Sequence, residues 1–138
     1  MLFRSDYSAT LVAACLDAVD VIIWTDVEGI MSANPNLVPS ARVLEAVTYQ
    51  EAAELSYYGA KVLHPKTLAP LAERGIPVWI KSSFRPDRLG TVIAPRGTFG
   101  LDSGSGARAV TALKQAALIT VESTGQLSVL PVDRKSVV

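Results

Sequence analysis

Thr25 and Asp26 follow a short apolar segment, and their side chains could bind a nucleotide or a metal ion. The preceding residues 21–24 form a continuous apolar run rich in β-branched side chains, which is typical of a strand buried on both faces. In open α/β sheets, ligands bind beyond the carboxyl ends of the strands. A carboxylate there could accept hydrogen bonds from ribose or base, or help to hold Mg²⁺. An Asp shortly before Gly29 is also a common turn residue, so the residues alone leave both interpretations open.

A second candidate segment runs from residue 59 to 67, where Lys61, His64 and Lys66 surround a predicted helix start at Pro65. Lysine binds phosphate as a point charge, and the N-terminus of a helix also favours anions. The same residues could instead form a solvated basic loop with a helix cap. We expect His64 to be a hydrogen-bonded loop residue, since nothing beside it resembles a catalytic triad or a metal site.

A third candidate is the pair Ser5 and Asp6, which precedes a predicted helix over residues 6–18. Either residue could be the N-cap of that helix. Such a pair can also face an anionic or amino-acid ligand. Apolar residues recur at helical spacing after it, so we expect Leu11, Val12, Cys15 and their neighbours to form the buried face.

Composition restricts the class of protein. The 138 residues are 49% apolar, and 13 basic residues balance 13 acidic ones, which argues against a general nucleic-acid binder. One cysteine and one histidine exclude an internal disulfide and a His- or Cys-rich metal cluster. There is no apolar run long enough to span a membrane and no signal-peptide pattern. We therefore expect a cytoplasmic domain without a membrane or nucleic-acid partner.

The elements that must position these residues alternate between helix and strand. Thr48 and Glu51 form a capping box at the start of a predicted helix over residues 49–58. A further helix is expected over 65–74 and strands over 77–81 and 90–93. This order predicts an α/β fold with a largely parallel sheet.

The C-terminal third of the sequence has a different composition. Residues 95–106 hold four glycines and two serines, as in a linker. Residues 109–113 and 117–121 then suggest two strands of a separate module, with little chain after them. No strand precedes the first predicted helix. We expect the chain to be a fragment of a longer protein.

Five segments carry a recognisable pattern: residues 5–9, 24–29, 49–55, 59–65 and 90–93. In this order and at this spacing, they resemble aspartate kinases of the amino-acid kinase family. The resemblance covers residues 5–93 and implies the C-terminal, nucleotide-binding half of a three-layer α/β sandwich over residues 1–94. Residues 95–106 would be a linker, and 107–138 the truncated start of an α+β regulatory domain of the ACT type.

The resemblance implies ATP-dependent phosphorylation of the β-carboxylate of L-aspartate to 4-phospho-L-aspartate, with Mg²⁺, in the biosynthesis of lysine, threonine and methionine. It also implies a homo-oligomeric parent enzyme. Thr25 and Asp26 would contact the nucleotide, and Lys61 with Val62 would line its site. Ser5 would bind substrate at the aspartate end.

Carried over in the same way, Asp6 would help to organise catalysis. The sequence also departs from the family pattern. Neither the lysine-bearing Lys-Phe-Gly-Gly motif nor Gly-Arg-Gly-Gly before Ser-Asp is present. Asn36 stands where the family usually has an arginine, and Met31 replaces a common tyrosine. We therefore expect this chain alone to be inactive. The alternatives are a non-catalytic nucleotide-binding or regulatory module and another amino-acid kinase, such as a glutamate or carbamate kinase.

Overall fold

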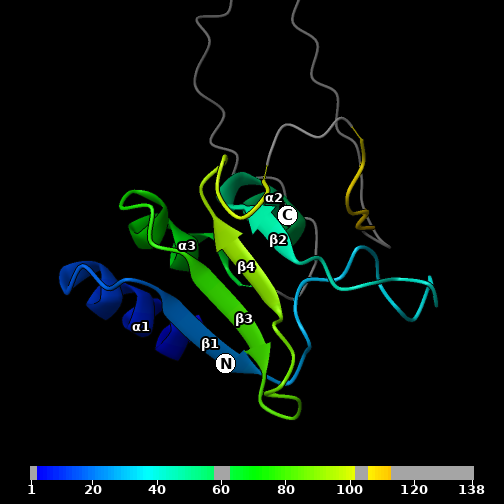
Figure 1. Cartoon of the computed structure of the whole chain (residues 1–138), viewed down its shortest axis with the longest axis horizontal. Coiled ribbons are helices and arrows are strands. Elements are labelled where there is room, and N and C mark those ends of the chain that lie inside the picture. Colours follow the sequence, from blue (N-terminus) through cyan, green and yellow to red (C-terminus); the bar gives the residue numbers. More distant parts are fainter. Residues whose placement is uncertain (1–2, 58–62, 102–105, 113–138) are drawn as a thin grey trace, which may run out of the picture.

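The computed structural model describes residues 3–57, 63–101 and 106–112 (Figure 1). The three helices and the strands at 21–25, 78–82 and 91–94 occur in the order that the sequence predicts, and a further short strand, at 46–48, was not predicted. The elements are α1 (Phe3–Cys15), β1 (Val21–Thr25), β2 (Ala46–Thr48), α2 (Tyr49–Tyr57), α3 (Pro65–Ala72), β3 (Val78–Ser82) and β4 (Thr91–Ala94).

The four strands form one mixed sheet in the order β1-β3-β4-β2. The β1–β3 and β2–β4 pairs are parallel, and β1 runs beside β3 from Val21 opposite Val78 to Thr25 opposite Ser82. The β3–β4 pair is antiparallel. The short loop between β3 and β4 is the reason, because a parallel connection needs a crossover of a dozen or more residues. The α/β fold is confirmed, with one antiparallel pair in an otherwise parallel sheet.

The helices cover one face of this sheet (Figure 1). Alternate residues of β3 point to that face, where Val78 and Ile80 are buried. They join one hydrophobic core with Ala13 of α1, Ala52 of α2 and Leu71 of α3. Each helix therefore buries apolar side chains against the same side of the strands.

The opposite face is covered over only part of its width by described residues. There Leu101 packs with residues of β2 and β4, and the ring of Phe99 meets Trp79 edge-on at 5.7 Å. Ile22 and Trp24 of β1 lie on the same face and are 45% and 51% exposed. The expectation that β1 is buried on both faces is therefore wrong for the described structure. Of the three expected layers, the described residues supply the sheet and one helical layer.

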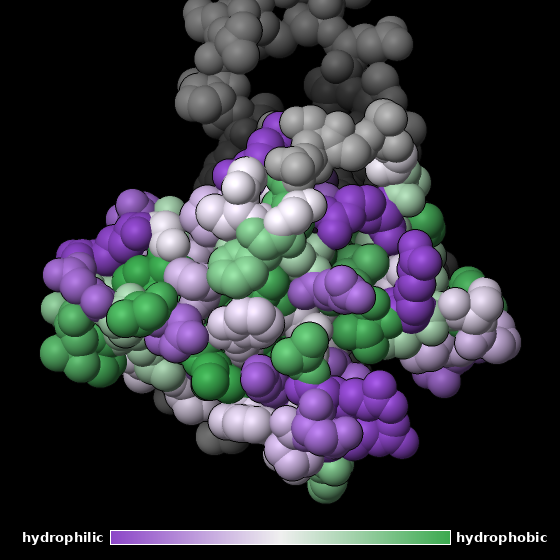
Figure 2. All heavy atoms as spheres, in the orientation of Figure 1, coloured by the Kyte–Doolittle hydropathy of each residue, from purple (hydrophilic) through white to green (hydrophobic). Residues whose placement is uncertain are grey.

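The buried side of α1 also differs from the prediction. Thr10, Ala13 and Ala14 are buried, whereas Cys15 and the large apolar residues Leu11, Val12 and Leu16 are exposed. Small side chains on the inner side let α1 approach α3 and the sheet closely. Hydrophobic residues consequently gather on the surface over α1, at the left edge of Figure 2.

The predicted helix starts of α2 and α3 are confirmed in detail. The backbone N–H of Thr48 donates to Glu51 Oε2 at 2.7 Å, and the N–H of Glu51 donates to Thr48 Oγ1 at 3.1 Å. At α3, His64 is the N-cap, and its Nδ1 accepts a hydrogen bond from the N–H of Lys66. Local hydrogen bonding thus sets both starts.

Residues 106–112 form no strand, although the first strand of the expected ACT-type module was placed at 109–113. The second, at 117–121, lies outside the described residues, so that module stays a prediction. Within the described ranges, none of the helices is long and apolar enough to cross a membrane.

Candidate functional site

Residues 25–28 and 82–85 lie side by side at one edge of the sheet, which we call the β1/β3 edge. The N-terminal turns of α1 and α3 are directed toward the same end of the sheet. β1 and β3 are parallel, so their carboxyl ends share an edge. Each of these helices precedes its strand along the chain and runs back along it, so the helix N-termini lie at that same end (Figure 1). Ligands of α/β sheets bind at such edges.

Thr25 and Asp26 lie at this edge, as predicted. The Thr25 hydroxyl donates to Asp26 Oδ1 at 3.1 Å. The Thr25 carbonyl accepts hydrogen bonds from the N–H of Ser83 at 2.8 Å and from the Ser83 hydroxyl at 3.0 Å. The backbone is therefore fixed, while the Asp26 side chain faces solvent and is open to a ligand.

The structure adds a polar segment that the sequence reasoning missed. Ser82 ends β3 and residues 83–85 follow it, just as Thr25 ends β1 and Asp26 follows it. The Arg85 guanidinium pairs with the carboxylate of Glu28 at 3.2 Å, with both side chains about half exposed. An exposed pair of this kind contributes little stability, but it places one positive and one negative charge beside Asp26. The polar pair Ser82-Ser83, at the end of an apolar strand, was the signal that could have revealed this segment.

Ser5 and Asp6 lie in the first turn of α1, which begins at Phe3. Neither residue is therefore the N-cap, because the helix starts before both. Burial raises the pKa of the Asp6 carboxyl, and a hydrogen bond with the Ser5 side chain opposes that increase. An acidic residue whose ionisation is opposed by burial is a candidate for function.

Lys61 and Val62 lie outside the described residues, so their place at the edge stays a prediction. Among the residues that are described, no group of three His, Cys, Asp or Glu side chains could hold a metal ion by itself. A cation here would need oxygen atoms from a ligand in addition to Asp26.

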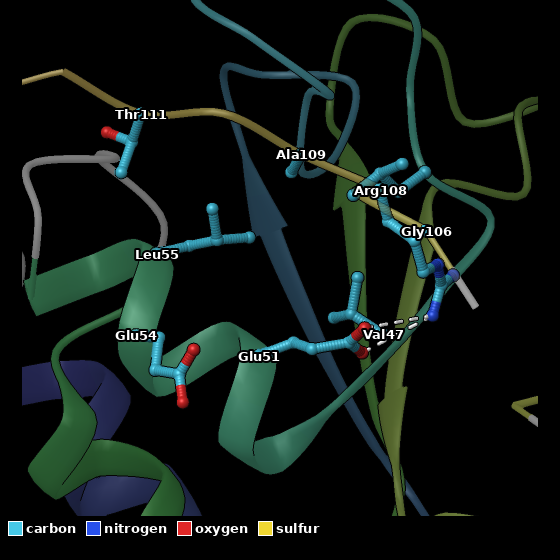
Figure 3. A pocket seen from close by; sticks show the side chains of 9 residues that line it. Val47, Glu51, Glu54, Leu55, Gly106, Arg108, Ala109 and Thr111 are labelled. Atoms are coloured by element: carbon cyan, nitrogen blue, oxygen red, sulfur yellow. Dashed lines mark hydrogen bonds and ion pairs between the residues drawn. The ribbon is translucent and has the colours of Figure 1, made fainter. Parts of the chain in front are cut away.

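A cavity of about 230 Å³ lies elsewhere, between α2 and residues 106–112 (Figure 3). None of the predicted site residues lines it. At its wall, Arg108 Nη1 contacts both carboxylate oxygens of Glu51 at 3.2 and 3.3 Å, and Nη2 donates to the carbonyl of Ala46. Glu51 thus caps α2 and also holds the segment that follows the sheet. We interpret this region as an attachment point rather than a ligand site.

Residues 1–82, which include α1, β1 and β3, match the model of the amino acid kinase family. The chain belongs to this family. The amino acid kinase fold is also shared with proteins of low sequence identity: a UMP kinase from Bacillus anthracis is 15% identical with a TM-score of 0.55, a likeness of fold alone.

More similar relatives are aspartokinases. A bifunctional aspartokinase/homoserine dehydrogenase of Buchnera aphidicola is 54% identical over 89 residues, covering 64% of this chain and 11% of the relative. A chloroplastic bifunctional enzyme of Arabidopsis thaliana is 41% identical over 127 residues, 91% of this chain and 14% of that protein. The structure of Escherichia coli aspartokinase III with aspartate and ADP is 44% identical with a TM-score of 0.63, covering 68% of this chain and 21% of that one. The chain thus spans a small part of each relative.

Proposed function

We propose that this chain supplies the nucleotide-binding part of an aspartate kinase, which transfers the γ-phosphoryl group of ATP to the β-carboxylate of L-aspartate. The observation that carries the proposal is the 44% identity to an aspartokinase solved with aspartate and ADP. The β1/β3 edge supports it, because polar and charged side chains of residues 25–28 and 82–85 lie together where α/β sheets bind ligands. The product is 4-phospho-L-aspartate.

In this proposal the residues divide into two groups along the edge. Thr25 and Asp26 contact the nucleotide, and Lys61 and Val62 line the same site. Ser5 and Asp6, in the first turn of α1, serve the aspartate and phosphoryl-transfer end. Phosphoryl transfer depends mainly on positioning and on stabilising negative charge. The hydrogen bonds from Ser83 to the Thr25 carbonyl supply part of that positioning.

Mg²⁺ enters the proposal together with the nucleotide. This ion is commonly held by one or two carboxylates and by phosphate oxygens, and the exposed Asp26 offers one carboxylate. The donor set therefore fits an ion that arrives on phosphates. When bound, Mg²⁺ offsets the negative charge of the phosphate groups.

Nucleotide binding tests the first group of residues. We expect the 138-residue chain to bind Mg·ADP weakly, and Asp26→Asn to weaken that binding further in a calorimetric titration. Asp20→Asn is the matched control, because Asp20 is also exposed but precedes β1 at its opposite end. Lys61→Ala should cost about 1–3 kcal/mol, the range for a charged hydrogen bond. Equal affinity in all of these proteins would remove Asp26 and Lys61 from the site.

A chimera tests the substrate. The residues of E. coli aspartokinase III that align with α1 to β4 would be replaced by those of this chain. We expect ADP release that depends on aspartate, and its loss in Asp6→Asn. A folded chimera that binds ADP but never turns over aspartate would favour the second candidate, a non-catalytic nucleotide-binding module. Asn36, which stands where the family usually has an arginine, is the observation that favours this second candidate.

A further inference from the structure

Residues 26–29 form a turn, which we call the Asp26 turn, and the loop that follows it is closed at its base. The N–H of Leu44 donates to the Ile30 carbonyl at 2.8 Å, and the N–H of Ser32 donates to the Arg42 carbonyl, also at 2.8 Å. Met31 and Val43 form an isolated antiparallel bridge between these bonds. Residues 30–44 therefore form a loop whose two ends are held together. We call its base, residues 30–32 and 42–44, the loop neck.

One buried side chain lies under the loop neck. The Thr91 hydroxyl, at the start of β4, accepts a hydrogen bond from the N–H of Ile30 at 2.8 Å and donates one to the Leu44 carbonyl at 2.6 Å. Thr91 is fully buried. A single hydroxyl thus satisfies a donor on one strand of the neck and an acceptor on the other, so its loss leaves two buried polar groups unpaired.

Gly29 shows how closely the turn approaches this hydroxyl. A Cβ at position 29 would lie 2.5 Å from Thr91 Oγ1 and 2.9 Å from Val43 Cγ1, and the backbone φ is +143°. Only glycine avoids both the contacts and the strained conformation. The close contact between Gly29 and Thr91 therefore fixes the C-terminal end of the turn against the start of β4.

The turn that carries Asp26 is consequently anchored at both of its ends. The Thr25 carbonyl is held by Ser83 at the end of β3, and the Ile30 N–H is held by Thr91. Only residues 26–29 lie between these anchors. The Glu28–Arg85 ion pair is a third contact, but it is half exposed and so a weaker constraint.

We propose that Thr91 is a positioning residue that sets the Asp26 turn for the nucleotide through its two hydrogen bonds to the loop neck; this inference rests on the proposed function. Thr91 is fully buried, so its side chain is not accessible to a nucleotide. Its hydroxyl acts through the backbone of Ile30. We expect removal of the hydroxyl at position 91 to lower nucleotide affinity. A serine there, which retains a hydroxyl, should restore that affinity.

The test compares the 138-residue chain with Thr91→Val, Thr91→Ser and Thr98→Val. Valine keeps the shape of threonine but lacks the hydroxyl. Thr98→Val is the matched control, because the Thr98 hydroxyl also donates to a backbone carbonyl, but it is exposed and its acceptor, Pro95, is only three positions away. The readouts are amide hydrogen exchange of residues 27–32 and 42–45 and the Kd of Mg·ADP.

We expect Thr91→Val to speed exchange at the neck and to weaken Mg·ADP on the order of tenfold, since the loss of one hydrogen bond to a charged group lowers affinity by about this factor or more. Thr91→Ser should restore both, and Thr98→Val should change neither. Faster exchange with unchanged affinity would overturn the positioning role.

If the unaltered chain binds no nucleotide, the proposed function fails. Exchange alone then decides whether Thr91 sets the turn, and unchanged exchange in Thr91→Val would refute it.

Discussion

Among the described side chains, Tyr49 has a pKa well above its ordinary value. Its hydroxyl donates to the carbonyl of Ile76, and burial raises the pKa of the phenol to about 12. The folded protein therefore favours the protonated phenol more than the unfolded chain does, where the pKa is about 10. The stabilisation is complete below pH 10 and is lost as the pH rises toward 12.

Tyr49→Phe should consequently lower the free energy of unfolding by about 1 kcal/mol at neutral pH, the usual contribution of one hydrogen bond. Between pH 10 and 12, the variant should lose stability less steeply than the unaltered chain. Urea unfolding at a series of pH values measures both effects. Parallel pH profiles for the two proteins would show that the phenol does not titrate in this range.

The residue scale also shows which interactions a sequence can reveal. The Thr48–Glu51 capping box joins residues three positions apart, so its spacing alone predicts it. His64 was expected only to be a hydrogen-bonded loop residue, although its cap is equally local. The Thr91 hydroxyl joins partners that are 61 and 47 positions away. No local pattern encodes such a contact, because it depends on the order of strands in the sheet.

For whole elements, α1 shows where hydrophobic periodicity misleads. The large apolar residues were expected to face the core, yet Leu11 is 39% and Leu16 is 74% exposed, and alanines occupy the inner side. The helix was predicted correctly and its orientation was not, because close packing on α3 selects small side chains. Burial of β1 on both faces was overestimated for a related reason: an apolar strand does not reveal what covers it.

The outer face of α1 should promote self-association, because no charged residue lies between Tyr7 and Leu16 and exposed apolar patches bind other surfaces. We expect the chain to form oligomers in sedimentation, and Leu11→Lys with Leu16→Lys to shift it toward monomer. Leu89→Lys is the control, since Leu89 is 75% exposed and Leu16 is 74% exposed, but Leu89 lies in the loop after β3. A compact monomer with cooperative melting in the unaltered chain would contradict this prediction.

On the scale of the molecule, the sequence predicts the α/β class, the order of the elements other than β2, and the polar edge at β1. Strand order was not predicted from composition or periodicity. The antiparallel return of β4 is what brings Thr91 beneath the loop neck, and the parallel β1–β3 pair is what brings Ser83 to the Thr25 carbonyl. The candidate site is therefore partly a product of topology, which the motif residues alone do not encode.

The last prediction is that this chain alone does not phosphorylate aspartate, because the 138 residues do not contain the cationic motifs that the reaction uses in this family. Phosphoryl transfer needs cations on the migrating group and a second group to hold the acceptor carboxylate. The lysine-bearing Lys-Phe-Gly-Gly and the Gly-Arg-Gly-Gly motifs are both absent from these residues, and Asn36 stands in place of a further cation. Removing one well-placed electrostatic donor costs about 10²–10³ in rate.

Two or three such losses should place turnover below detection, although Asp6, Thr25 and Asp26 are present. A coupled assay for ADP release with aspartate and Mg²⁺ measures this directly, using the purified 138-residue chain with and without an added segment that carries the lysine motif of a related aspartokinase. Aspartate-dependent turnover by the chain alone would refute the prediction. Activity that appears only when the segment is added would show that the β1/β3 edge is competent and lacks only the cations that the segment provides.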